Sequence, residues 1–183
     1  MIWHLASPAV QVHRDWTGKR NHGLNCRNAA IMDPAMSRPM PASRLEFRWF
    51  LPITTRFMDN DAFAHVNNVI YYSWIDTAVN RFLMDHALLD LRASPVIGIV
   101  VESGCQYRSQ IAYPDDVTIG LRVDRLGNSS VRYGLGIFRA EEDVASAEGH
   151  FVHVYVDRAS MRPVPIPDHI RAVMRTVSIE GVT

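Results

Sequence analysis

The chain has 183 residues, of which 48% are hydrophobic, so it is long enough for one domain with a full apolar core and a tail. Its 19 basic residues balance 19 acidic residues, which gives no electrostatic reason to expect nucleic acid or an anionic membrane as a partner. No apolar run approaches the ~20 residues that a membrane-spanning helix needs. The two cysteines, Cys26 and Cys105, form no CxxC or metal-ligand spacing. We therefore expect a reducing, cytoplasmic location.

Residues 1–43 show no sustained period of 2 or 3.6 and are interrupted by prolines. We expect them to form a disordered or extended N-terminal tail. The stretch MIWHLASPAV is too short for a secretory signal and lacks its basic leader. An organelle transit peptide stays an alternative, as does translation that begins at Met32, Met36 or Met40.

A strand is predicted first after this tail, because every second side chain of residues 45–53 is apolar. These side chains are Leu45, Phe47, Trp49, Leu51 and Ile53. In residues 67–89 the spacing changes, because apolar side chains recur every three or four positions. This spacing predicts a helix with one apolar face. Its side chains are Tyr71, Trp74, Ile75, Ala78, Phe82 and Leu83. Asn67 or Asn68 is a suitable N-cap for this helix.

Four further strands and a short helix are predicted after Pro95. The strands cover residues 96–111, 116–126, 131–138 and 144–156, and the helix covers residues 168–177 with Asp168 as its cap. The order is therefore strand, long helix and four strands with short connections. One helix on an antiparallel sheet is an α+β layer arrangement, and a curved sheet wrapped around the long helix satisfies it.

The polar loop DNDAFAHVNN, residues 59–68, lies between the predicted first strand and the predicted long helix. Residues 56–78 around it, RFMDNDAFAHVNNVIYYSWIDTA, resemble the signature of the hotdog-fold thioesterases of the 4-hydroxybenzoyl-CoA thioesterase type. That pattern is an aspartate, a short loop that is often His-Val-Asn-Asn, and a helix with a tyrosine and an acidic residue. The residues that match it are Asp61, His65, Val66, Asn67, Asn68, Tyr71 and Asp76. The segment IAYPDDVTIGLRVDRLGNSS, residues 111–130, also resembles the family's sheet.

The resemblance implies a hotdog domain over residues 44–178, with an antiparallel sheet of about five strands wrapped around one long helix. It implies an acyl-CoA thioesterase that needs no metal or cofactor. It also implies a homodimer or homotetramer whose active sites lie between subunits, so that strands near residues 99–107 of another subunit would supply the opposing wall.

Thioester hydrolysis needs a base or nucleophile and a stabiliser for the oxyanion that develops on the carbonyl. By the resemblance, Asp61 is the base or nucleophile, and these two roles stay open. A helix N-terminus offers unpaired N–H groups and partial positive charge, so backbone amides near Asn67 and Asn68 would hold the thioester oxygen. Removal of one oxyanion donor costs ~10²- to 10³-fold in rate.

Each candidate residue also has a structural interpretation. Asp59 could cap a turn or pair with Arg56. His65 could orient Asp61 or contact substrate, or it could fix the loop through a backbone hydrogen bond. Asn68 could serve the helix cap as well as the substrate, and Tyr71 fits a core or pocket wall better than a catalytic role.

Asp76 lies two turns into the predicted helix and is an alternative catalytic acid, because a second group of hotdog thioesterases carries its carboxylate on the helix. Otherwise we expect it to be structural or to contact the substrate. Cys105 fits a half-buried strand cysteine better than a nucleophile, because nothing flanking it in the sequence would lower its pKa.

Two other activities stay open. Acyl-carrier-protein thioesterases share the HVNN motif, but their loop has asparagine where this chain has Phe63. A hotdog protein that binds acyl thioesters without cleaving them is the alternative from another class, since fold does not fix function. A hydratase is disfavoured, because its loop needs an Asn-Pro that is missing here and one more residue between the positions of Asp61 and His65.

Overall fold

The structure, a computed structural model, describes residues 39–179. Of the predicted tail, residues 1–38 lie outside the described residues. Closer to the predicted domain, Ala42 is buried and Ser43 pairs in an isolated bridge with Val144. Neither of the two α-helices within residues 39–179 is long and apolar enough to cross a lipid bilayer.

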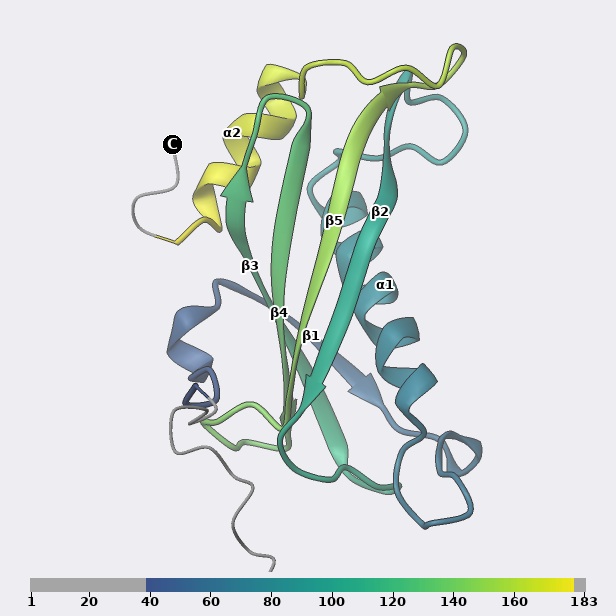
Figure 1. Cartoon of the computed structure of the whole chain (residues 1–183), viewed down its shortest axis with the longest axis vertical. Coiled ribbons are helices and arrows are strands. Elements are labelled where there is room, and N and C mark those ends of the chain that lie inside the picture. The colour runs from purple at the N-terminus through teal and green to yellow at the C-terminus, as the bar shows by residue number, and fades with distance from the viewer. Residues whose placement is uncertain (1–38, 180–183) are drawn as a thin grey trace, which may run out of the picture. The chain divides into compact units, whose positions relative to one another are not determined.

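A five-stranded antiparallel sheet forms the body of the domain (Figure 1). The strands are β1 (Trp49–Thr54), β2 (Val96–Tyr107), β3 (Asp116–Leu126), β4 (Ser130–Arg139) and β5 (Ala147–Asp157). Their order across the sheet is β1-β3-β4-β5-β2, so β1 and β2 are the two edge strands. The pairs β3–β4 and β4–β5 join strands that are consecutive in the chain. In contrast, β2 precedes β3 in the chain but lies at the other edge of the sheet from β1, where it pairs with β5.

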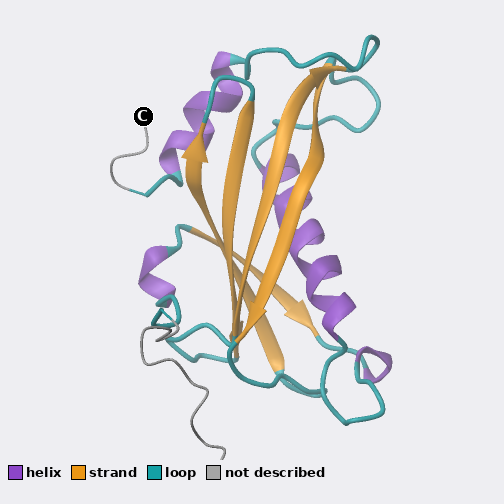
Figure 2. Cartoon of the chain, in the orientation of Figure 1, coloured by secondary structure: helices purple, strands orange, loops and turns teal. Residues whose placement is uncertain are grey.

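The long helix α1 (Asn68–Asp85) packs across one face of this sheet (Figure 2). The predicted apolar face is confirmed, because every one of its six side chains is buried. They pack against the inward side chains of the central strands, among them Leu121, Tyr133 and Leu135. The short helix α2 (Asp168–Thr176) adds Ile170 and Met174 to the same core. Its N-cap is Pro167 rather than the expected Asp168, which is the first helical residue.

The expected strand over residues 45–53 is correct only from Trp49. Residues Arg44–Glu46 form a 3₁₀ turn, η1, and Leu45 is 84% exposed. The cause is local, because Ser43 and Glu46 form a capping box. Glu46 Oε1 accepts the Ser43 N–H at 2.7 Å, and Ser43 Oγ accepts the Leu45 N–H at 3.3 Å. The alternating pattern of the sequence is therefore broken where the capping hydrogen bonds are made.

Phe47 lies in a second, smaller apolar cluster with Ala42, Phe138 and Ala145. Neighbouring residues on β4 alternate between the two faces of the sheet, and Ile137 belongs to the main core. The Phe47 cluster is therefore on the face opposite α1. Gly136 makes room for it, because a Cβ there would lie 2.6 Å from Phe47 Cζ.

Candidate active site

Asp59 anchors the loop between β1 and α1. Its side chain is completely buried and accepts hydrogen bonds from the Arg56 backbone N–H at 2.8 Å and from Arg56 Nε and Nη2 at 3.0 and 2.8 Å. Its carbonyl oxygen accepts the Asn67 N–H at 2.9 Å. The structural interpretation of Asp59 as a partner of Arg56 is thus confirmed, and this carboxylate has no access to a substrate.

Asp61 lies two residues further, where the loop makes a tight turn. Its backbone N–H donates to the His65 carbonyl at 2.9 Å, and Ala64 takes a left-handed φ of 66° to close the turn. Asp61 Oδ1 accepts the Phe63 N–H at 2.8 Å. Among the described residues, no hydrogen bond reaches Asp61 Oδ2. The side chain is 24% exposed, so one carboxylate oxygen is held by the loop while the other is available.

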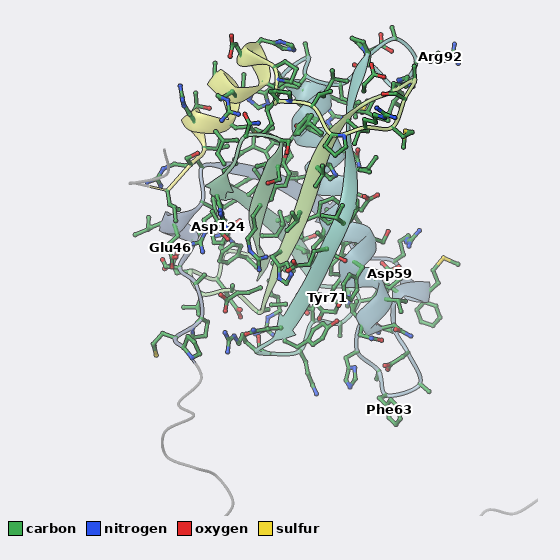
Figure 3. The ribbon with its side chains drawn as sticks, turned by 45° about the horizontal axis from the view of Figure 1, so that its top comes forward. Glu46, Asp59, Phe63, Tyr71, Arg92 and Asp124 are labelled. Atoms are coloured by element: carbon green, nitrogen blue, oxygen red, sulfur yellow. The ribbon has the colours of Figure 1, made fainter. Side chains whose placement is uncertain are left out.

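His65 is next to this carboxylate, with Nδ1 3.6 Å from Asp61 Oδ1. That distance is too long for a hydrogen bond but short enough for attraction when the ring is protonated. His65 also holds the loop through its carbonyl, so both interpretations of this residue have a structural basis. Its ring stacks on Phe63, which points outward at the tip of the loop (Figure 3).

The N-terminus of α1 supplies one unpaired amide to the same place. Asn67 is the N-cap, and its Oδ1 accepts the Val69 N–H at 3.2 Å. The Asn67 N–H is occupied by Asp59. Within residues 39–179 no hydrogen bond uses the Asn68 N–H. Of the amides expected near the helix start, that of Asn68 is therefore the one free to bind a carbonyl oxygen, at the positive end of the helix.

These groups line a pocket of about 220 Å³. The lining residues are Asp61, His65, Val66, Asn68, Tyr71, Tyr107, Ser109 and Gln110. Four of the six candidate residues are thus brought together from the loop and the first turn of α1. The wall includes the Tyr71 ring, whose pKa is raised to about 12 mainly by burial, so the phenol is neutral near pH 7.

The other two candidates lie outside the pocket lining. Asn67 serves the helix cap. Asp76 is exposed on the side of α1 that faces away from the core, and its Oδ1 accepts a hydrogen bond from Asn80 Nδ2 at 3.2 Å. In this chain the structure therefore separates Asp76 from Asp61, Asn68 and the pocket.

Tyr107, Ser109 and Gln110 line the pocket although the sequence did not single them out for it. They come from the end of β2 and the loop that follows. Tyr107 reaches the pocket within its own chain. The expected approach of residues 99–107 from another subunit stays a prediction. The pairing of β2 with β5 brings Tyr107, Ser109 and Gln110 to the N-terminus of α1. Their spacing along the chain therefore could not predict that they line the pocket.

Cys105, near the end of β2, is half-buried. Burial raises the pKa of its thiol to about 11, so the thiolate is scarce near neutral pH and the residue is a poor nucleophile. No group of three or more His, Cys, Asp or Glu side chains within residues 39–179 is arranged to hold a metal ion.

The family model described as the thioesterase-like superfamily matches residues 55–174. The chain belongs to the thioesterase-like superfamily. The match spans the anchored loop, α1 and the four strands that follow, so the region that defines the family also contains the pocket.

Solved structures of this superfamily have the same fold. The PA5185 protein from Pseudomonas aeruginosa is 46% identical, with a TM-score of 0.74 over 78% of this chain and 99% of that one. A structure described as a predicted thioesterase from Bacillus stearothermophilus is 26% identical, with a TM-score of 0.63 over 72% of this chain and 96% of that one. The BH1999 gentisyl-coenzyme A thioesterase is 24% identical and shares the fold, with a TM-score of 0.61 over 69% of this chain and 99% of that one. No curated protein matches the chain.

These findings confirm three predictions made from the sequence. The chain is a member of the hotdog thioesterases, it has the α+β hotdog fold with five antiparallel strands, and its enzyme class is thioester hydrolase. The carrier of the acyl group and the roles of the individual residues are not fixed by family membership.

Proposed function

We propose that this thioesterase hydrolyses an acyl-CoA to the free acid and CoA, with its chemistry at Asp61. The observation that carries the proposal is the shared pocket of the Asp61 carboxylate and the unpaired Asn68 N–H. A carboxylate and an amide donor on residues that line one pocket are the two kinds of group that attack on a thioester carbonyl requires. Coenzyme A is favoured as the carrier because the BH1999 neighbour is named as a coenzyme A thioesterase.

In the proposed reaction the thioester oxygen accepts a hydrogen bond from the Asn68 N–H, which stabilises the negative charge that develops there. Asp61 Oδ2 then either takes a proton from a water that attacks the carbonyl carbon or attacks that carbon itself. In the first route the carbon–sulfur bond breaks, the CoA sulfur leaves with the electron pair and takes up the proton that Asp61 had accepted, and the water oxygen enters the acid. In the second route loss of the CoA sulfur leaves a mixed anhydride between the acyl group and Asp61. A water then cleaves this anhydride, which releases the acid, regenerates the Asp61 carboxylate and supplies the proton for the CoA thiolate.

The Phe63 N–H holds Asp61 Oδ1 at 2.8 Å, and a protonated His65 ring would attract the same oxygen from 3.6 Å. Oδ2 is therefore the oxygen proposed to face the reacting carbon.

Asn67 and Tyr71 support this arrangement in the proposal, since one caps the helix that carries the amide and the other walls the pocket. The position of Asp76 outside the pocket lining favours Asp61 as the catalytic acid. Asp76 keeps a proposed role in binding substrate where the exposed side of α1 meets CoA or a second subunit.

The exposed edge of the sheet supports a proposed homodimer. β2 is 12 residues long, and one of its sides is paired with β5. Val100 and Val101 on it are 48% and 56% exposed. An unprotected, apolar edge strand is a template for pairing with another chain. We propose that two copies pair through β2, which places the pocket beside Tyr107 close to the subunit boundary, and that pairing of such dimers would give a tetramer.

The test is thiol release from short, long and aromatic acyl-CoAs, measured with a chromogenic thiol reagent against an enzyme-only blank. Asp61→Asn keeps the size of the side chain but removes its basicity. We expect kcat to fall by ~10²- to 10⁴-fold, the range for loss of a general base, while the melting temperature and acyl-CoA binding are retained. Asp76→Asn is the comparison variant and should keep kcat, with any effect confined to KM, because Asp76 lies outside the pocket lining and its proposed role is in binding.

Each result separates the alternatives. Activity that survives in Asp61→Asn and is lost in Asp76→Asn would move the chemistry to the helix. A wild-type chain that binds acyl-CoA but releases no thiol from it would refute the proposed substrate. Acyl-carrier-protein thioesters would then separate a different carrier from a protein that only binds.

A further inference from the structure

We infer that Tyr107 is a positioning residue for the reaction, which fixes the first turn of α1 so that the Asn68 N–H points at the thioester oxygen. The inference rests on the proposed function, because it assigns a residue to the same site. Tyr107 itself need not touch the reacting atoms. It would act through Asn68, the residue whose amide binds the developing oxyanion.

The strand side of this link is rigid. Tyr107 is the last residue of β2 and pairs with Ala147 of β5. The next two backbone amides, Arg108 N–H and Ser109 N–H, both donate to the Ser146 carbonyl, at 2.9 and 3.0 Å. The backbone on either side of the Tyr107 ring is therefore fixed to the sheet. Any group that the side chain holds takes its position from the sheet.

The helix side of the link is Asn68. The Tyr107 hydroxyl donates to the Asn68 carbonyl at 3.3 Å. Within residues 39–179 this is the one hydrogen bond that joins a strand of the sheet to α1. The neighbouring helix-start groups are held differently, since Asn67 is bound to Asp59 and Val69 to the Asn67 side chain. The link to Tyr107 therefore acts on the residue that carries the free N–H.

Ring packing adds direction to this contact. The Tyr107 and Tyr71 rings meet edge to face, with centroids 5.0 Å apart, and both rings line the pocket. This arrangement is a favoured one for aromatic pairs. It fixes the angle from which the Tyr107 hydroxyl approaches the helix. Removing the Tyr107 hydroxyl while keeping its ring should make the position of the Asn68 N–H less fixed, while the ring still packs against Tyr71 in the pocket wall.

The phenol is a permanent donor. Tyr107 is 40% exposed, and the partial burial of its hydroxyl, followed by the nearby Cys105, Tyr72 and Tyr71, raises its pKa above the ordinary value. The hydroxyl therefore keeps its proton throughout the pH range in which the thioester itself survives. Removal of the Tyr107 hydroxyl should accordingly lower the rate of thioester hydrolysis by a constant factor at every pH and leave the shape of the pH–rate profile unchanged.

The test uses Tyr107→Phe in the full chain, with Tyr72→Phe as the matched control. The two tyrosines are 40% and 38% exposed, and no hydrogen bond within the described residues involves the Tyr72 hydroxyl. Rates of thiol release from benzoyl-CoA and hexanoyl-CoA give kcat and KM, and thermal unfolding reports on stability. We expect Tyr107→Phe to lower kcat by about 2- to 10-fold, the effect of one neutral hydrogen bond. KM and the pH profile should be unchanged, and the melting temperature should fall by no more than about 5 °C. Tyr72→Phe should match the wild type.

A kcat for Tyr107→Phe equal to that of the wild type would overturn the inference. So would a rise in KM at constant kcat, because that result assigns Tyr107 to substrate binding, and so would a fall in kcat that is matched by Tyr72→Phe. These results all presuppose a wild-type chain that releases thiol. If it releases none, the proposed function fails first, and the role of Tyr107 in it fails with it.

Discussion

Asp59 and Asp61 lie two residues apart, and their surroundings give them opposite roles. Asp59 has both oxygens occupied by Arg56 and no exposed surface. Asp61 has one oxygen bound to the loop and is partly open to the pocket. The first carboxylate therefore holds the loop in place, and the second can react.

Asp59→Asn tests the anchoring role. The substitution replaces one carboxylate oxygen with an NH₂ group, which cannot accept a hydrogen bond from Arg56. At least one charge-assisted hydrogen bond between the two residues is therefore lost. We expect the free energy of unfolding to fall by about 1.5–3 kcal/mol, as measured by urea unfolding at neutral pH. Asp85→Asn breaks the exposed pair with Arg81 and should cost less than about 1 kcal/mol. Equal effects of the two substitutions would contradict the anchoring role.

His153 predicts how stability depends on pH. It is 3% exposed in the core, beside the Tyr133 and Phe151 rings, and burial lowers its pKa to about 4. The unfolded chain binds a proton at this residue near pH 6.5. The folded state is therefore favoured fully above pH 6.5, and this contribution is lost as the pH falls from 6.5 to 4.

For the wild type we expect the contribution of His153 to fall by about 2–3 kcal/mol between pH 7.5 and 4.5. His153→Leu cannot titrate, so its unfolding free energy should change that much less over the same interval. Urea unfolding of both chains at the two pH values makes the comparison. Parallel pH dependences of the two chains would show that His153 does not contribute.

At the residue scale, the sequence predicted which residues of the loop and of the helix start lie together at the pocket, and their catalytic roles stay predictions. Asp61, His65, Asn68 and Tyr71 lie within one loop and one helical turn, so their proximity follows from local structure. Tyr107 is 39 residues from its partner Asn68. Its place in the pocket depends on which strand pairs with β5, and spacing along the chain carries no information about that.

At the scale of elements, periodicity predicted α1 and the central strands because their side chains each meet one apolar core. It failed at residues 44–47, where the turn capped by Ser43 and Glu46 ends the alternation. The consequence is that Phe47 packs on the face of the sheet opposite α1. Gly120 and Gly136 leave the space for its ring, since a Cβ at either would approach within 3 Å of it.

Phe47→Ala separates the stability of this outer cluster from catalysis. Phe47 is buried, so its truncation should lower the free energy of unfolding by about 3–5 kcal/mol. The pocket lies on the side of α1, so kcat measured well below the melting temperature should stay close to that of the wild type. Urea unfolding and thiol release on the same preparation check both parts. A large fall in kcat at a temperature where the variant is folded would show that the outer cluster supports the site.

At the scale of the whole molecule, the proposed dimer depends on β2, which is the longer of the two edge strands and pairs with only one neighbour in the chain. Replacing both Val100 and Val101 with lysine places charge on this edge, which is how natural proteins discourage edge pairing. We expect the variant to run as a monomer where the wild type runs as a dimer, as measured by size-exclusion chromatography with light scattering. Val144→Lys is the control, since Val144 is 50% exposed on the loop before β5. A variant with the mass of the wild type would contradict pairing through β2.

The exposed edge also has a consequence for how the enzyme responds to its own concentration. If two copies complete each other's pocket through β2, assembly obeys mass action, and the active fraction depends on the dissociation constant of the dimer. Specific activity would then fall on dilution below that constant and recover when the protein is concentrated again. In a cell the same relation would tie thioester turnover to the expression level more steeply than in direct proportion.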